Sequence, residues 1–265
     1  MTDDLTPLSL VDEDEIVLDE AALMLARLDH PDTDLAPYHD TVVAIATRLE
    51  IVGMGASSAA ARAAALAAVF ADDFGFEGDA VTYDDPANAD LIRVIDRRRG
   101  LPVSLSILYV SAARRLGWEA APLNVPGHVL VLIGAEASPV IVDPFRHGRI
   151  VTAEQLAAIL DTSGGGDAVR HVETMANRAV LVRLLLNQAT RAEAAGQGRR
   201  ALTLYRRMTL VAPGYAQGWW EAARLELVDG DVDAARRSLG TILEITRDAG
   251  LRRRVSDVLS RLAAT

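Results

Sequence analysis

The chain has 265 residues, of which 50% are hydrophobic and only 5% are aromatic, a composition that predicts one or two globular domains rich in helix. It contains no cysteine, which excludes disulfides, thiolate metal sites and a cysteine nucleophile. The net charge of −10 argues against general nucleic-acid binding, because a negative protein repels phosphate backbones.

The charge excess lies at the N-terminal end. The first forty residues hold twelve Asp or Glu and a single basic residue, Arg27. We expect residues 1–17 to form a solvated, disordered leader, with a docking segment for a basic partner as the alternative. The acidic start differs from the basic-then-apolar pattern of a secretory signal, and no strongly apolar run approaches the ~18 residues that a spanning helix needs. We therefore expect a cytoplasmic protein that does not enter a membrane.

Apolar spacing and capping residues predict a series of helices in the first half of the chain. They are expected over residues 18–28, 38–49, 57–70 and 102–116, and a further helix capped by either Asn88 or Asp90 is expected to run to Arg98. Pro102 suits the first turn of the helix over 102–116, and Gly117 ends it.

A β-rich block follows, with strands expected over 120–125, 128–133 and 138–143 and a short helix over 152–161. If the hairpin loop spans 134–137, Ile133 pairs with Ser138. His128 then stands directly opposite Asp143 on the same face, with Cβ atoms ~5 Å apart. A histidine held by an aspartate is the orienting half of a nucleophilic triad, because the carboxylate sets the imidazole tautomer.

From Glu173 onward the sequence predicts only helices, and these repeat. Gly196 and Gly230 are 34 residues apart, as are Ala201 and Ala235. A period of about 34 residues in helical sequence is typical of tetratricopeptide repeats. The SGGGD segment at 163–167 indicates a flexible boundary between a core domain at 18–165 and a helical region at 170–265.

Three segments in order carry a family resemblance: RRRGLPVSLSILYVSAARRLGW, NVPGHVLVLI and VDPFRHG. They resemble the SirB-type proteins, which are described as regulators of sirC expression with transglutaminase-like and tetratricopeptide domains. The resemblance implies an α+β fold. Its core would be transglutaminase-like (papain-like), with a small antiparallel sheet, and an all-α helical tail of tetratricopeptide type would follow.

The resemblance also implies where a catalytic cysteine would stand, at the start of the helix that precedes the sheet. The position fifteen residues before Gly117 is Pro102, which has no nucleophilic group. The nearest hydroxyls belong to Ser104 and Ser106. Ser104 could point towards His128 as a substitute nucleophile, but a hydroxyl in a first helical turn is more often a helix cap.

The favoured function is therefore that of a non-catalytic binding or regulatory module with a protein or peptide partner. The alternative is a hydrolase or acyl-transfer enzyme that uses Ser104, His128 and Asp143. No cofactor is expected. His128, His147 and Asp143 could together form a two-histidine, one-carboxylate metal site, but we favour a surface turn at His147. A metal site at His30 and His39 is likewise not favoured.

Overall fold

The computed structural model describes residues 5–134, 138–161 and 172–263. These residues form two compact units, which are described one at a time. The larger comprises residues 13–180, and the smaller comprises the residues up to 12 together with those from 181 onward. The division falls within a helix, after Val180. The SGGGD segment, where the sequence predicts a boundary, lies outside the described residues.

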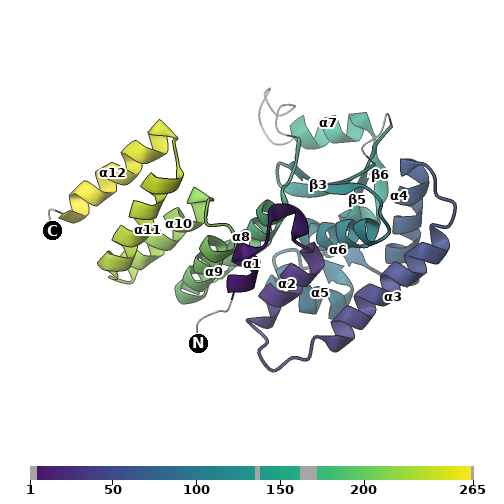
Figure 1. Cartoon of the computed structure of the whole chain (residues 1–265), viewed down its shortest axis with the longest axis horizontal. Coiled ribbons are helices and arrows are strands. Elements are labelled where there is room, and N and C mark those ends of the chain that lie inside the picture. Colours follow the sequence, from purple (N-terminus) through teal and green to yellow (C-terminus); the bar gives the residue numbers. More distant parts are fainter. Residues whose placement is uncertain (1–4, 135–137, 162–171, 264–265) are drawn as a thin grey trace. The chain divides into compact units, whose positions relative to one another are not determined.

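The larger unit is mostly helical around a small sheet, as the sequence predicts (Figure 1). Its α-helices are α2 (Leu18–Arg27), α3 (Ala36–Val52), α4 (Ala59–Ala67), α5 (Leu91–Arg97), α6 (Pro102–Arg115) and α7 (Ala153–Asp161). A π-helical turn, η2 (Ala68–Asp73), continues α4, and three 3-10 turns occur at η1 (Glu13–Glu15), η3 (Pro86–Ala89) and η4 (Pro144–Arg146).

Helix α6 is the central element of this unit. Every residue from Pro102 to Ala113 is buried, as expected for a helix that is apolar on all sides. Helices α2 and α3 and strands β3 (Ala120–Val125) and β4 (His128–Ile133) pack around it. Gly117 ends the helix with a φ of 69°, a conformation that glycine adopts without steric cost.

The main sheet has five strands in the order β6-β5-β4-β3-β7, and all neighbouring pairs are antiparallel. The remaining strands are β5 (Val140–Asp143), β6 (Arg149–Val151) and β7 (Glu173–Thr174). Helix α7 covers one face through Leu156 and Ile159, which pack on the cluster formed by Leu123, Val125 and Leu130. Helix α6 lies against the other side of β3 and β4 (Figure 1).

Three features of this unit differ from the sequence-based expectation. Residues 173–174 form the edge strand β7 and not the start of a helix. A second, parallel pair joins β1 (Glu77–Gly78) to β2 (Arg99–Gly100), neither of which was predicted. The hairpin register is also shifted, because Ile133 pairs with Val140 and not with Ser138.

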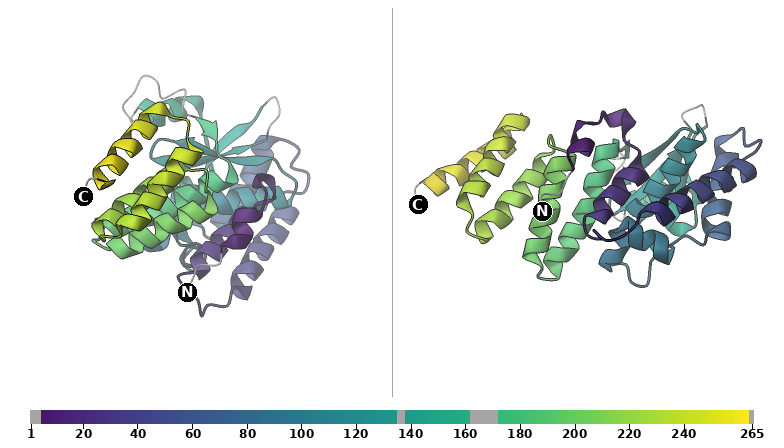
Figure 2. Two further views of the ribbon diagram at one scale, coloured as in Figure 1. Left: turned by 60° about the vertical axis from the view of Figure 1, so that its left-hand side comes forward. Right: turned by 60° about the horizontal axis from the view of Figure 1, so that its bottom comes forward.

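The smaller unit is a run of helices, with the last part of α8 (Asn177–Ala194) followed by α9 (Gly198–Val211), α10 (Ala216–Val228), α11 (Val232–Ile245) and α12 (Ala249–Ala263). Each helix from α9 onward packs on the next (Figure 2). The first residues of α9 and α11 are 34 positions apart. Left-handed glycines at 196 and 230 make the tight turns that precede these two helices.

The expectation that residues 1–17 are disordered is wrong for the part that the structure describes. Residues Thr6–Leu10 form helix α1, which packs against α9, and η1 follows at Glu13–Glu15. Leu5 and Leu8 are buried. Their burial orders the segment even though acidic residues lie beside them, because burying an aliphatic side chain stabilises the folded state by roughly 1.5–3 kcal/mol. Among the described helices, none is long and apolar enough to cross a membrane.

Candidate functional site

The start of α6 is the position at which the family resemblance implies a nucleophile. Pro102 occupies the first turn and is buried, and Leu101 precedes it as an N-cap residue without a side-chain hydrogen bond. Proline suits this position because it fixes φ and its missing N–H would have no helical partner. The helix therefore begins here for a conformational reason, with no reactive atom in the side chain.

Ser104 makes a different contact from both of those predicted. It is fully buried, and its hydroxyl donates a hydrogen bond to the Asn88 carbonyl oxygen at 2.8 Å. The predicted helix cap is therefore wrong. In the described part of the chain no hydrogen bond joins Ser104 to His128. Ser106 is also buried and donates to the Val129 carbonyl oxygen at 3.3 Å. Both hydroxyls thus tie α6 to neighbouring backbone.

His128 and Asp143 do meet, although they are not directly opposite each other. The His128 Nε2 and Asp143 Oδ1 atoms are 2.9 Å apart, with 18% of the histidine side chain and 4% of the aspartate side chain exposed. The predicted register is wrong by two residues, since Val131 pairs with Val142. A shift of two keeps both side chains on the same face, and diagonal neighbours in a sheet remain within reach of long side chains.

The sheet face that carries this pair is the one beneath α7. Successive side chains of a strand alternate between faces, so His128 shares its face with Leu130 and Leu132. Both leucines belong to the cluster that packs on α7. The histidine therefore lies on the face away from α6, the helix that carries Ser104. The structure brings His128 and Asp143 together without bringing the candidate hydroxyl to them.

An aromatic group flanks the pair on one side. The Phe145 ring lies edge-on to the His128 ring, with centroids 5.9 Å apart, and Tyr83 packs on Phe145 in the same manner at 5.8 Å. The Phe145 amide also donates to Asp143 Oδ1 at 3.0 Å. A Cβ on Gly78 would come within 2.4 Å of the Phe145 ring, so only glycine leaves room for this ring.

A second polar group near Asp143 was not recognised in the sequence. The hydroxyl of Tyr109, on α6, is buried and has no hydrogen-bond partner among the described residues. Burial raises the pKa of Tyr109, and the negative charges of Asp143 and Asp72 raise it further. The phenol therefore stays neutral. Gly148 adopts a φ of 68°, and a Cβ there would lie 2.8 Å from the Tyr109 oxygen.

The histidines considered as metal ligands lie apart from one another. His147 is exposed, ends η4 in a left-handed conformation and lies 3.6 Å from a Glu77 oxygen. His30 contacts Asp90 at 2.6 Å, and His39 contacts Glu20 at 3.1 Å. Within the described ranges, no three side chains of His, Asp or Glu are grouped so as to hold a metal ion.

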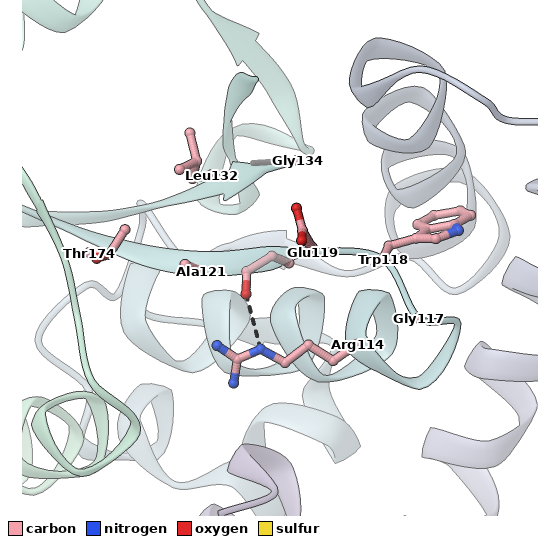
Figure 3. Close-up of a pocket in the computed structure, with 9 residues that line it drawn as sticks. Arg114, Gly117, Trp118, Glu119, Ala121, Leu132, Gly134 and Thr174 are labelled. Atoms are coloured by element: carbon pink, nitrogen blue, oxygen red, sulfur yellow. Dashed lines mark hydrogen bonds between the residues drawn. The ribbon is translucent and has the colours of Figure 1, made fainter. Parts of the chain in front are cut away.

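Two of the clefts in the described part of the larger unit border the main sheet and offer space for a ligand. One, of about 500 Å³, lies beside the connection from α6 to β3 and is lined mainly by Trp118, Leu132 and small residues (Figure 3). Arg114 borders it and is held by the Ala120 carbonyl oxygen, to which its Nε donates at 3.0 Å. The other, of about 370 Å³, includes Asp143. That second cleft adjoins the His–Asp pair.

The smaller unit contains a cleft of its own, of about 460 Å³, lined by residues of α9, α10 and α11. Glu226 at its base is almost fully buried, and its carboxylate accepts hydrogen bonds from Arg206 and Ser238. Trp219 borders the cleft and donates its indole N–H to the Pro213 carbonyl oxygen, while Trp220 stacks under Arg254. Mixed charges and one aromatic ring thus line this surface.

Comparison with known proteins identifies relatives of the chain. Residues 36–186 match the family model described as the transglutaminase-like superfamily. A UPF0162 protein of Xylella fastidiosa strain 9a5c is 28% identical over 244 residues, which are 90% of this chain and 87% of that protein. Another, from strain Temecula1, is 31% identical over 68% of this chain and 66% of its own length. Human F-box only protein 21 is 33% identical over 33% of this chain and 15% of its length.

Proposed function

Because the chain belongs to the transglutaminase-like superfamily and yet contains no cysteine, we propose that it is a non-catalytic protein that binds a protein or peptide partner and acts as a regulatory module. The observation that carries the proposal is that the start of α6 presents no nucleophilic side chain to His128 among the described residues. Its first turn holds Pro102 where the thiol would stand, and Ser104 is buried with its hydroxyl on the Asn88 carbonyl oxygen. Acyl transfer needs a nucleophile within hydrogen-bond reach of its base.

The helical region supports the binding part of the proposal. We assign it to the tetratricopeptide type, as in SirB-type proteins, on the 34-residue spacing of α9 and α11. Repeats of this type stack helix pairs and present a concave surface to extended partners. The cleft on α9, α10 and α11 has exposed arginines at 206 and 237, a combination suited to a peptide with acidic side chains. A cytoplasmic location is part of the same proposal and is in keeping with the absence of cysteine.

The catalytic part is tested by an acyl-transfer assay on the purified full chain. A fluorescent primary amine and a glutamine-containing peptide serve as substrates, and wild type is compared with His128→Ala. We expect no incorporation by either protein. Incorporation that is lost in His128→Ala would overturn the proposal. Labelling by a fluorophosphonate that disappears in Ser104→Ala would favour a serine hydrolase instead.

The binding part is tested by affinity capture followed by mass spectrometry. The bait is the full chain, as wild type, as Arg237→Glu in the cleft, and as Arg253→Glu on the exposed side of α12 as a matched control. We expect partners that wild type and Arg253→Glu retain and that Arg237→Glu loses. A partner set that Arg237→Glu leaves unchanged would remove the helical cleft as the binding surface.

A further inference from the structure

The cleft that adjoins Asp143 is formed by β5, η4, β6 and α7, all within the larger unit. Its volume of about 370 Å³ lies within the ~300–1,000 Å³ typical of small-molecule sites. Charged and apolar groups line separate parts of it. The residues that matter here are Asp143, Arg146, Arg149, Val151, Gln155 and Ile159.

The charged part of the cleft has more positive than negative groups. Asp143 stands directly opposite Arg149 in the β5–β6 ladder, so the two side chains share a face. Even so, Arg149 belongs to no ion pair among the described residues. Arg146 approaches Asp143 Oδ2 only to 3.7 Å and is 73% exposed. The carboxylate is meanwhile engaged by His128 and by the Phe145 amide. One carboxylate thus faces two guanidinium groups, and that of Arg149 forms no ion pair with a described residue.

The apolar part comes from the same sheet face and from the helix above it. Val151 follows Arg149 by two residues in β6, and Ile159 projects from α7, both within the cluster that fills the space between sheet and helix. Ala158 adds a further small apolar surface. A ligand chain placed on this wall would remove apolar surface from water at roughly 25 cal/mol per Å².

From this arrangement we infer that the cleft binds a small aliphatic carboxylate. Its carboxylate would lie between Arg149 and Arg146, and its chain would lie on Val151 and Ile159. A planar carboxylate suits guanidinium groups because two parallel N–H donors can serve its two oxygens. The inference goes beyond the proposed function and does not depend on it, since the cleft lies in the sheet unit and needs neither the helical cleft nor a nucleophile.

Binding of a carboxylate at this position should change the surroundings of His128 and Asp143. A ligand carboxylate draws Arg146 away from Asp143 and adds a negative charge beside it. Because His128 Nε2 is hydrogen-bonded to Asp143, the surroundings of the imidazole ring then change. The ring resonances of His128 therefore report on an anion in the cleft, even though the histidine does not touch the ligand.

The experiment is a titration of the full chain with hexanoate at low ionic strength, followed by NMR of the isoleucine methyl groups and of the histidine rings. Three probes serve as controls: hexylammonium and 1-hexanol share the chain without the carboxylate, and acetate has the carboxylate without the chain. We expect saturable shifts of Ile159 and His128 with hexanoate, with binding at least tenfold weaker for each control. Arg149→Gln should weaken hexanoate binding about tenfold, the effect of losing one charge-assisted interaction of ~1.4 kcal/mol.

The matched variant is Arg93→Gln, an exposed arginine on α5 outside the cleft, which should change hexanoate binding less than twofold. An unchanged urea midpoint for both variants shows that each is folded. Equal binding of hexanol and hexanoate would overturn the inference, as would equal weakening by the two variants or the absence of saturable shifts. None of these outcomes bears on acyl transfer or on partner capture, so the proposed function stands or falls separately.

Discussion

Asp79 offers a quantitative test of how the loop before α5 is held in place. Its side chain is 2% exposed, and its carboxylate accepts hydrogen bonds from the Thr82 amide at 2.7 Å, the Thr82 hydroxyl at 2.6 Å and Arg97 Nη2 at 2.9 Å. Arg97 in turn donates a hydrogen bond to the side-chain oxygen of Asn88. The backbone carbonyl oxygen of Asn88 accepts a hydrogen bond from the Ser104 hydroxyl. The network thus connects this loop to the first turn of α6.

The magnitude follows from the pKa of the carboxyl group. Burial by itself would raise the pKa of Asp79, but hydrogen bonds from Thr82 and Asn88 and the positive charge of Arg97 outweigh it and lower the pKa from 3.8 to about 2. At ~1.4 kcal/mol per pKa unit, the charged form contributes about 2 kcal/mol to folding. Because the folded-state pKa is depressed, this stability is fully present above about pH 4 and is lost as the pH falls towards 2.

The perturbation is Asp79→Asn. The amide keeps one acceptor for the backbone but places an NH₂ group against Arg97 and the Thr82 hydroxyl, so we expect a loss of about 2 kcal/mol at pH 7. The difference from wild type should shrink as the pH falls from 4 to 2, because the native carboxyl begins to take up its proton near its pKa of about 2. Asp96→Asn is the control, because the Asp96 side chain is 44% exposed and its ion pair with Arg93 is long, at 4.0 Å. That change should cost less than about 0.5 kcal/mol.

Urea unfolding of the larger unit can be followed by itself. The chain has three tryptophans, of which Trp118 lies in the larger unit and Trp219 and Trp220 lie in the smaller one. A Trp219→Phe, Trp220→Phe background leaves Trp118 as the only indole reporter. A cost for Asp79→Asn that stays the same from pH 7 to pH 2 would refute the electrostatic reasoning, and so would a cost equal to that of Asp96→Asn.

Three further substitutions test individual contacts by the same method. Gly148→Ala should destabilise the larger unit, because left-handed backbone strain costs about 1–3 kcal/mol and the new Cβ would also lie 2.8 Å from the Tyr109 oxygen. An unchanged urea midpoint would contradict the close packing. Tyr109→Phe should leave stability unchanged or raise it by up to ~1 kcal/mol, since the hydroxyl it removes has no partner among the described residues, and a clear loss would reveal one. Glu226→Gln, followed through Trp219 and Trp220, should cost about 1–3 kcal/mol because the buried carboxylate serves both Arg206 and Ser238, and a neutral result would show that those bonds add nothing.

The β4–β5 hairpin shows where sequence reasoning succeeded and where it reached its limit. Both strands and the contact between His128 and Asp143 were predicted, but the register was wrong by two residues. A one-residue error would have turned every apolar side chain to the wrong face and would have been visible in the pattern. A two-residue error preserves the alternation, so the apolar pattern cannot detect it. Only the length of the turn decides between the two registers.

Short or isolated elements escaped prediction for a related reason. Strands β1, β2 and β7 have two residues each, too few to show any periodicity, and they exist because a partner strand lies beside them. The burial of Leu5 and Leu8 was hidden by the acidic residues around them, since composition averages over a segment and packing selects single side chains. The contact of Ser104 with Asn88 likewise depends on a loop sixteen residues earlier in the chain.

The sequence by itself determined the helical core around α6, the apolar hairpin, the 34-residue spacing of the last helices and the absence of a thiol, because these properties depend on residue type and local period. The contact between His128 and Asp143 could be predicted, but only the tertiary structure decided its register and the partners of the other polar groups. In the structure the His128–Asp143 pair lies beneath α7, and the Ser104 hydroxyl donates to a backbone carbonyl oxygen. Arg149 lies opposite Asp143 without an ion pair among the described residues. Such contacts join residues from different strands, helices and loops at distances of a few ångströms, and local patterns in the sequence carry no information at that precision.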